Sequence, residues 1–379
     1  MQIANACSRL DLPSWLSSLE ERYPESSAGL GLVSAWQDLI SQNKCPLSVE
    51  FTKQRFRELE GNFGDKLTVL FGRPISHSLS PALHNFFNLG MSNKFSLYLP
   101  TQIESESSFI RILRHWQELP LVGANVTSPF KECAFRYLLE HGQLSQEARI
   151  IGAVNTIWSS GGQIYGDNTD WCGWLASWRH YMGEELTGRD TVIFGAGGAA
   201  RAVVYALIRS KVKSITIVNS PRRGQELTTY FNSWQQSRNS NQAFIPIQRC
   251  STWSEYGKPG CVYIQATVLG SSAFPNLTPY DWADSSSTLS QKYTCNCNNK
   301  MHNSETVTPP LACDLIYNPS QTEFLRLAQK SGSKTMNGLG MLICQAYRAR
   351  AKFFNLTPSE IEEERLVNSF SSVYSQSIS

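Results

Sequence analysis

The 379-residue sequence lacks the features that mark membrane, secreted and nucleic-acid-binding proteins. No apolar run approaches the roughly 20 residues that a membrane helix needs. The first residues have neither a basic stretch nor the apolar core of a secretory signal. Lys and Arg number 34 against 31 Asp and Glu, and the net charge of +3 leaves no electrostatic footprint for nucleic acid or an anionic membrane. We therefore expect no nucleic-acid partner and no membrane association.

Paired cysteines are also missing. None of the ten cysteines forms a CxxC pair, and the chain is too long for a disulfide-stapled miniprotein. Cys295 and Cys297 are separated by one residue and have no second pair, so a polar loop is a better interpretation than a metal site. The pattern predicts reduced thiols in a cytoplasmic protein that holds no metal.

The chain does contain alternating strand-like and helix-like segments. Buried-strand candidates in the first half are Leu67–Phe71, Leu121–Val126 and Ile150–Trp158, and those in the second half are Thr191–Phe194, Ile215–Val218, Val262–Ala266 and Leu311–Ile316. Helices are predicted from Ser80–Pro81, with Ser80 as N-cap, from Pro129, from Gly195, and near Gln321–Lys330, Gly340–Phe354 and Pro358 onward. This alternation predicts an α/β fold with mostly parallel sheets.

Two segments carry no such pattern. Residues 1–66 hold apolar patches but no motif that can be tied to chemistry, so they are interpreted as an N-terminal extension of unknown role. Residues 271–310 are rich in Ser, Thr and Asn, which predicts a long surface loop.

A glycine-rich turn follows the strand predicted at Thr191–Phe194. The sequence GAGGAA over residues 195–200 fits the GxGxx(G/A) pattern, in which glycines let the backbone approach a pyrophosphate at a helix N-terminus. The same turn can also occur where a helix only packs closely on a strand. The predicted cofactor-binding residues here are Gly195, Ala196, Gly197, Gly198 and Ala199.

The end of the next strand bears on the choice of dinucleotide. An acidic residue there binds the ribose 2′-hydroxyl of NAD, whereas a nearby arginine accepts the 2′-phosphate of NADP. The chain has Asn219 after Val218, and Arg222 and Arg223 follow. This favours NADP and leaves NAD possible, and the two arginines could alternatively be a solvated helix start.

Five further motifs occur in order along the chain: GRPISHSLSP at 72–81, GANVTSPFK at 123–131, IGAVNT at 151–156, GDNTD at 166–170 and NGLGMLICQA at 337–346. Together they resemble the shikimate dehydrogenase family, and the sequence GDNTDW at 166–171 is most like that of fungal members. The resemblance implies a substrate-binding α/β domain plus a Rossmann-like dinucleotide-binding domain with a cleft between them. The substrate domain would cover 67–169, completed by C-terminal helices in 337–379, and the NADP domain would cover 170–336.

The resemblance also implies the residues of the site. Lys131 would be the acid/base, since a lysine amine can exchange a proton while a carboxylate holds it in place, and Asp170 would be its partner. Substrate-binding residues would be Ser78, Ser80, Thr127, Asn155 and Gln345, and Gly338 would join the cofactor-binding residues. The alternatives are purely structural roles: a surface salt bridge for Lys131 and Asp170, an N-cap for Ser80 and a turn residue for Asn155.

The function implied is NADP-dependent reduction of 3-dehydroshikimate to shikimate. One alternative is a quinate dehydrogenase that uses NAD, and another is a non-catalytic regulator that binds the same ligands. Two departures from the family bear on the cofactor: Ser220 and Pro221 replace the usual Arg-Thr, and Gln265 replaces an Asn. The sequence does not indicate an oligomeric state.

Overall fold

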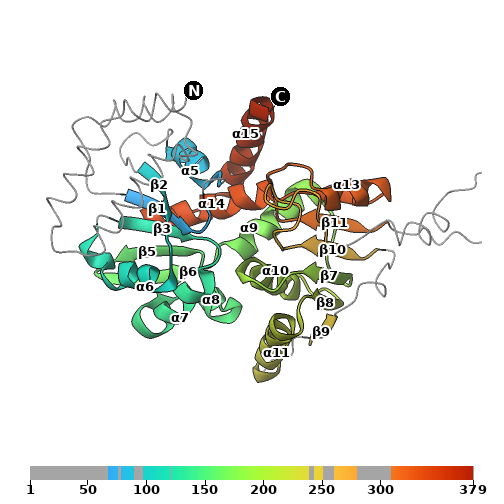
Figure 1. Cartoon of the computed structure of the whole chain (residues 1–379), viewed down its shortest axis with the longest axis horizontal. Helices are drawn as coiled ribbons and strands as arrows, with labels where there is room; N and C mark the ends of the chain where they lie inside the picture. Colours follow the sequence, from blue (N-terminus) through green and yellow to red (C-terminus); the bar gives the residue numbers. More distant parts are fainter. Residues whose placement is uncertain are drawn as a thin grey trace, which may run out of the picture. The chain divides into compact units, whose positions relative to one another are not determined.

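The computed structural model describes residues 67–75, 78–88, 97–119, 121–238, 243–250, 260–279 and 309–378 (Figure 1). The chain divides into two compact units, and the first division falls between Thr169 and Asp170. Residues 345–366 return to the first unit, while residues up to Cys344 and from Val367 onward belong to the second. The sequence-based division assigned all of 337–379 to the first. The 1–66 extension and residues 280–308 of the predicted loop lie outside the described residues.

The first unit contains a six-stranded sheet. Its strand order is β2 (Leu97–Gln102), β1 (Leu67–Gly72), β3 (Leu121–Val126), β5 (Thr156–Ser160), β6 (Gln163–Asp167) and β4 (Gln143–Leu144). Strands β2, β1 and β3 run parallel, but β5 is antiparallel to both of its neighbours. The prediction of a mostly parallel sheet therefore holds for this unit with one exception, since β5 alone among the described strands of this sheet runs in the opposite direction. The cause is the hairpin turn at Gly161 and Gly162, whose φ values of 57° and 75° reverse the chain after β5.

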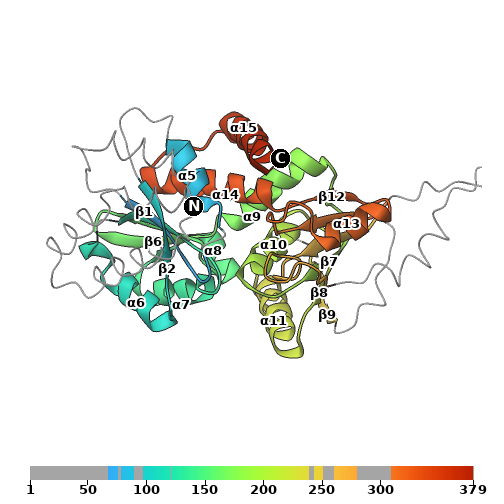
Figure 2. The same ribbon diagram turned by 45° about the horizontal axis from the view of Figure 1, so that its top comes forward.

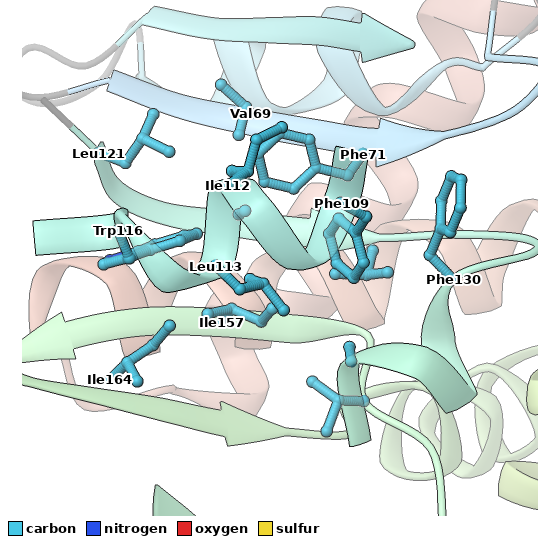
Figure 3. Packing of buried hydrophobic residues seen from close by; sticks show 14 of the residues in the cluster. Val69, Phe71, Phe109, Ile112, Leu113, Trp116, Leu121, Phe130, Ile157 and Ile164 are labelled. Atoms are coloured by element: carbon cyan, nitrogen blue, oxygen red, sulfur yellow. The ribbon is translucent and has the colours of Figure 1, made fainter. Parts of the chain in front are cut away.

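Helices cover both faces of this sheet. Those of the first unit are α5 (Ser80–Asn88), α6 (Glu106–Arg114) with the 3₁₀ turn Trp116–Glu118, α7 (Lys131–His141) and α8 (Gln146–Ile151), with parts of α14 (Leu339–Phe354) and α15 (Glu360–Ile378). Helix α6 buries Phe109, Ile112 and Leu113 at helical spacing against Val69 and Phe71 of β1 (Figure 3). On the opposite face, Phe353 and Ala349 of α14 pack against Leu70.

The strand predicted over Ile150–Trp158 is wrong in its first half. Helix α8 continues to Ile151, and Gly152 ends it in the left-handed conformation with φ 71°. The hydroxyl of Ser145 caps the start of this helix by accepting a hydrogen bond from the Ala148 N–H. Periodicity cannot separate a short apolar helix from a buried strand, and here the apolar run contains the buried end of a helix followed by β5.

The second unit contains a six-stranded sheet that is entirely parallel. Its order is β12 (Lys334–Met336), β11 (Leu311–Asp314), β10 (Val262–Gln265), β7 (Asp190–Phe194), β8 (Ser214–Val218) and β9 (Ile247–Cys250). Counted from the central strand outward this is the doubly wound order of dinucleotide-binding folds. The predicted strands at 191–194, 215–218, 262–266 and 311–316 are confirmed to within two residues at each end.

The helices of the second unit are α9 (Asp170–Ser177), which continues as a π-helical turn Trp178–Met182, then α10 (Gly198–Arg209), α11 (Pro221–Ser237) and α13 (Glu323–Lys330). Helix α13 lies beside β11 and β12, of which β11 is labelled in Figure 1 and β12 in Figure 2. Its Phe324 ring packs edge-on against Phe194 at 6.0 Å between centroids. No helix within the described residues is both long and apolar enough to cross a membrane.

Candidate active site

The carboxyl ends of β1 and β3 meet at one edge of the first sheet. The Thr127 N–H donates to the Phe71 carbonyl at 2.8 Å, and the Arg73 N–H donates to the Ser128 carbonyl at 3.0 Å. The loop that leads to Ser78 and Ser80 and the loop that leads to Lys131 therefore leave the sheet side by side. Lys131 is half-buried and is the first residue of α7, as predicted for a residue just inside a helix after a strand.

Two further segments reach the same edge because β5 is antiparallel. Thr156, the first residue of β5, is in register with Asn125 near the end of β3 and with Asp167 at the end of β6. Asn155, just before β5, and Thr169, just after β6, are therefore brought to the edge that carries Thr127. The Val154 N–H donates to the Lys131 carbonyl at 2.9 Å, which ties the start of α7 to this segment.

Asn155 is the centre of this arrangement, and its side chain is buried. Its Oδ1 accepts from the Thr169 N–H at 2.8 Å and from the Thr156 hydroxyl at 2.8 Å. Its Nδ2 donates to Thr169 Oγ1 at 3.0 Å and to Gln345 Oε1 at 3.3 Å. Asn155 is thus more than a turn residue, since it joins a predicted site residue on α14 to the segment that ends at Asp170.

Sequence reasoning did not single out the partners that surround Asn155. Asn125 donates through Nδ2 to the Asn155 carbonyl at 3.2 Å, and it accepts from the Tyr98 hydroxyl at 2.9 Å. Thr156 and Thr169 complete the network. The available signal was the presence of polar residues inside strands that are otherwise buried, since such groups require hydrogen-bond partners.

Ser78 and Ser80 are both buried at the start of α5. The helix begins at Ser80, and the Ser78 Oγ accepts a hydrogen bond from the Ser80 N–H at 3.2 Å. The prediction that Ser80 is the N-cap that precedes the helix is therefore displaced by one position, because Ser80 already lies within α5. Both hydroxyls lie in the stretch that follows β1.

The first unit thus gathers a cationic lysine, hydroxyls and carboxamides at one sheet edge. Hydroxyls and carboxamides both donate and accept, which suits a ligand with several ring hydroxyls, and a helix start with serine hydroxyls suits a carboxylate. Asp170, the predicted partner of Lys131, follows Thr169 directly and is buried as the first residue of α9 in the second unit. Cys133 is unsuited to act as a nucleophile, since burial raises the pKa of its thiol to about 11.

The glycine turn of the second unit has the geometry that a dinucleotide requires. Gly195 has φ 111°, and a Cβ at this position would lie 2.7 Å from the Ala266 carbonyl oxygen, so only glycine fits. Gly197 is the N-cap of α10 and makes no side-chain cap, and a Cβ there would meet nothing within 4 Å. The turn lies beside the point where the strand order reverses between β7 and β10. The first N–H groups of a helix that starts at such a turn can bind an anion. These residues fit a pyrophosphate.

Glycine is required at position 338 for a different physical reason. A Cβ at Gly338 would lie 2.0 Å from the Leu315 carbonyl oxygen, and the Gly338 N–H donates to the Ile316 carbonyl at 3.0 Å. Glycine therefore lets the start of α14 touch the backbone that follows β11. Gln265, which replaces the family's Asn, shapes the loop after β10: its Nε2 donates to the Leu269 carbonyl and its Oε1 accepts from the Thr267 N–H.

The end of β8 carries no carboxylate. Asn219 Oδ1 accepts from the Ser220 N–H at 2.8 Å and so turns the chain into α11. The Arg222 side chain is 83% exposed and pairs with Glu226 at 3.6 Å, and Arg223 is exposed as well. No cluster of potential metal ligands occurs among the residues with described positions.

Comparison with known proteins gives a consistent result. Residues 70–157 match the family model described as the shikimate dehydrogenase substrate binding domain. Shikimate dehydrogenase (NADP(+)) of Carboxydothermus hydrogenoformans is 33% identical over 300 residues, which cover 77% of this chain and 93% of that protein. The corresponding protein of Desulforamulus reducens is 34% identical over 282 residues, covering 74% of this chain and 87% of its own.

Solved structures extend the likeness to the fold. Shikimate 5-dehydrogenase from Thermus thermophilus, solved in complex with NADP(H) and shikimate, is 27% identical with a TM-score of 0.59. The match covers 80% of this chain and 98% of that one. A chorismate mutase/shikimate 5-dehydrogenase fusion protein from Clostridium acetobutylicum is 25% identical with a TM-score of 0.63, over 81% and 97% of the two chains.

Proposed function

Because the chain belongs to the shikimate dehydrogenase family, we propose that it catalyses the reversible, NADPH-dependent reduction of 3-dehydroshikimate to shikimate. The observation that carries this proposal is the hydrogen-bonded edge of the first sheet. There Asn155 joins Gln345 to Thr169, which precedes Asp170, and the N–H of the neighbouring Val154 donates to the Lys131 carbonyl at the start of α7. The relatives that are named for NADP support the cofactor.

Lys131 is the acid/base in this proposal. In the direction of reduction its ammonium gives a proton to the oxygen of the 3-keto group, and in the reverse direction its amine takes the hydroxyl proton. The nicotinamide, when bound, supplies or accepts the hydride. Asp170 holds the lysine amine in place and accepts a hydrogen bond from a substrate hydroxyl. The reaction as proposed requires no metal.

The remaining polar residues divide between the two ligands. Ser78 and Ser80 bind the substrate carboxylate, and Thr127, Asn155 and Gln345 orient the ring hydroxyls. The residues that hold NADP are Gly195, Ala196, Gly197, Gly198, Ala199, Asn219 and Gly338. An arginine near the end of β8 holds the 2′-phosphate, and the arginines that the sequence offers for this task, Arg222 and Arg223, lie exposed at the start of α11. In this proposal the first unit is the substrate domain and the second the NADP domain. We also propose a cytoplasmic location, which agrees with the lack of any CxxC pair among the ten cysteines of the sequence.

The test is turnover followed by the absorbance of the reduced nicotinamide, with shikimate and quinate each crossed against NADP and NAD. We expect the highest rate with shikimate and NADP. A preference for quinate and NAD would contradict the assigned specificity but leave the family unchanged. Absence of turnover in all four combinations, in folded protein that still binds shikimate, would instead indicate a regulator.

The Lys131→Ala variant tests the mechanism. We expect turnover to fall by about 10² to 10⁴, the usual contribution of general acid–base catalysis, while calorimetry still detects shikimate binding. Lys330→Ala is the matched control, because Lys330 is an exposed lysine at the end of α13. Near-normal turnover in Lys131→Ala would refute its role.

A further inference from the structure

A third arginine lies at the end of β8, contributed by the neighbouring strand. Arg249 is on β9, where it is in register with Ile217 of β8, and the next pair in the ladder is Cys250 with Val218. Its side chain extends toward the β8 end, because the Arg249 Nε donates to the Asn219 carbonyl at 3.4 Å. Arg249 is therefore located where the chain leaves β8, although it follows Asn219 by 30 positions.

Gly224 of α11 makes room for this side chain. A Cβ at Gly224 would lie 3.1 Å from Arg249 Cγ and 3.3 Å from its Cδ, and also 3.3 Å from Asn219 Cβ. The first turn of α11, the Asn219 side chain and the aliphatic part of Arg249 thus pack together. Any larger residue at position 224 would push against the arginine stem.

In dinucleotide-binding folds, the ribose of the adenosine half is recognised at the end of the second strand, which in this unit is β8. A 2′-phosphate there requires a cationic group with several donors. A guanidinium has five N–H groups, and the bond to Asn219 uses only Nε, so the two Nη groups form the fork that matches phosphate oxygens. Among the described residues, no hydrogen bond to either Nη group of Arg249 is found.

Arg249 is better prepared for this role than Arg222 or Arg223. The Arg222 side chain is 83% exposed and forms an ion pair with Glu226, a carboxylate that competes with a phosphate. Arg223 is also exposed, whereas Arg249 is half-buried and held at both its stem and its Nε. A side chain that is already ordered loses less conformational entropy when it binds a ligand.

We infer that Arg249, and not the arginine pair of α11, is the main residue by which this chain recognises the 2′-phosphate of NADP. The inference rests on the proposed NADP dependence. Gly224 and Asn219 are positioning residues in it, since they orient the guanidinium. Ser220 stands where the family usually has an arginine at the end of this strand, and Arg249 takes over the role of that arginine.

The test is isothermal titration calorimetry of NADP and of NAD against the full-length protein and its variants. Arg249→Gln should weaken NADP binding by about 10- to 100-fold, the value of a charge-assisted hydrogen-bonded contact. NAD binding should change by no more than about threefold, because NAD carries no 2′-phosphate. Arg249→Lys, which keeps the charge but loses the fork, should fall between the wild type and Arg249→Gln.

The matched controls are Arg222→Gln and Arg223→Gln, each expected to change NADP affinity by less than about threefold. The inference is overturned if Arg249→Gln leaves the ratio of NADP to NAD affinity unchanged, or if it weakens both cofactors equally, which would show a structural role. Retained NAD binding reports that each variant is folded. Failure of the proposed function is seen separately, as a wild-type protein that does not oxidise shikimate with NADP.

Discussion

Replacing Asn155 by alanine tests whether its carboxamide organises the edge of the first sheet at which β1 and β3 end. The residue is 2% exposed. The substitution removes the acceptor of the Thr169 N–H at 2.8 Å and the donor to Gln345 Oε1 at 3.3 Å. A buried polar group that loses its partner costs about 1–3 kcal/mol, so these two groups together predict a loss of about 2–6 kcal/mol.

This loss of stability should lower both the melting temperature and the turnover rate. A change of this size lowers Tm by roughly 4 to 24 °C for a domain of this scale, which near-UV circular dichroism measures. Turnover of shikimate should also fall, because the Thr169–Asp170 segment loses its hydrogen bond to Asn155. Both quantities should be measured on the same preparation.

The matched control for this substitution is Gln117→Ala. Gln117 is a carboxamide of the same unit, but it is exposed on the 3₁₀ turn Trp116–Glu118. We expect it to change stability by less than about 0.5 kcal/mol and to leave turnover unchanged. If Asn155→Ala melts within about 1 °C of the wild type, the network does not stabilise the fold as described.

Two other predictions concern the second unit. Gly338→Ala should lower Tm by several degrees, since its Cβ would lie 2.0 Å from the Leu315 carbonyl oxygen. Gly197→Ala should leave Tm unchanged, because its Cβ would meet nothing within 4 Å. It should instead weaken NADP binding in calorimetry. A lowered Tm in Gly197→Ala with normal NADP binding, or an unchanged Tm in Gly338→Ala, would contradict the role given to that glycine. Burial raises the pKa of Asp314 from 3.8 to about 7, so the folded state binds more protons than the unfolded chain in that range and stability falls as pH rises across it. Melting curves at a series of pH values should show this slope in the wild type and a flatter one in Asp314→Asn, and identical slopes would count against it.

The alternation of strands and helices was readable from the sequence because apolar runs of strand length are bounded by glycine and proline signals. The strand at Thr191–Phe194 and the turn at Gly195 are examples, and the structure confirms the strand and requires glycine at the turn. The prediction failed where that signal is ambiguous. Residues 150–158 are mostly apolar, yet a helix end, the Gly152 turn and a strand share the run.

For the candidate site, the sequence could predict which residues take part, from motifs in a fixed order, but not which of them contact one another. Lys131, Asn155 and Gln345 could be named, but the sequence does not indicate that Asn155 and Gln345 touch, since 190 positions separate them. Their contact depends on how α14 lies on the sheet, which is decided by packing such as that of Phe353 against Leu70. Tyr98 and Asn125 were missed for the same reason, since their hydrogen bond joins two separate strands and no local sequence pattern predicts it.

The sequence by itself therefore determined the local elements, the glycine turn and the identity of the residues that follow the strand ends, because these depend on neighbours within a few positions. Only the tertiary structure decided which of those residues meet. Antiparallel β5 brings Asn155 beside Thr169, and the parallel pairing of β9 with β8 brings Arg249 beside Asn219. Such contacts are set by strand order and register, which arise from burial of the whole sheet and not from any short stretch of sequence.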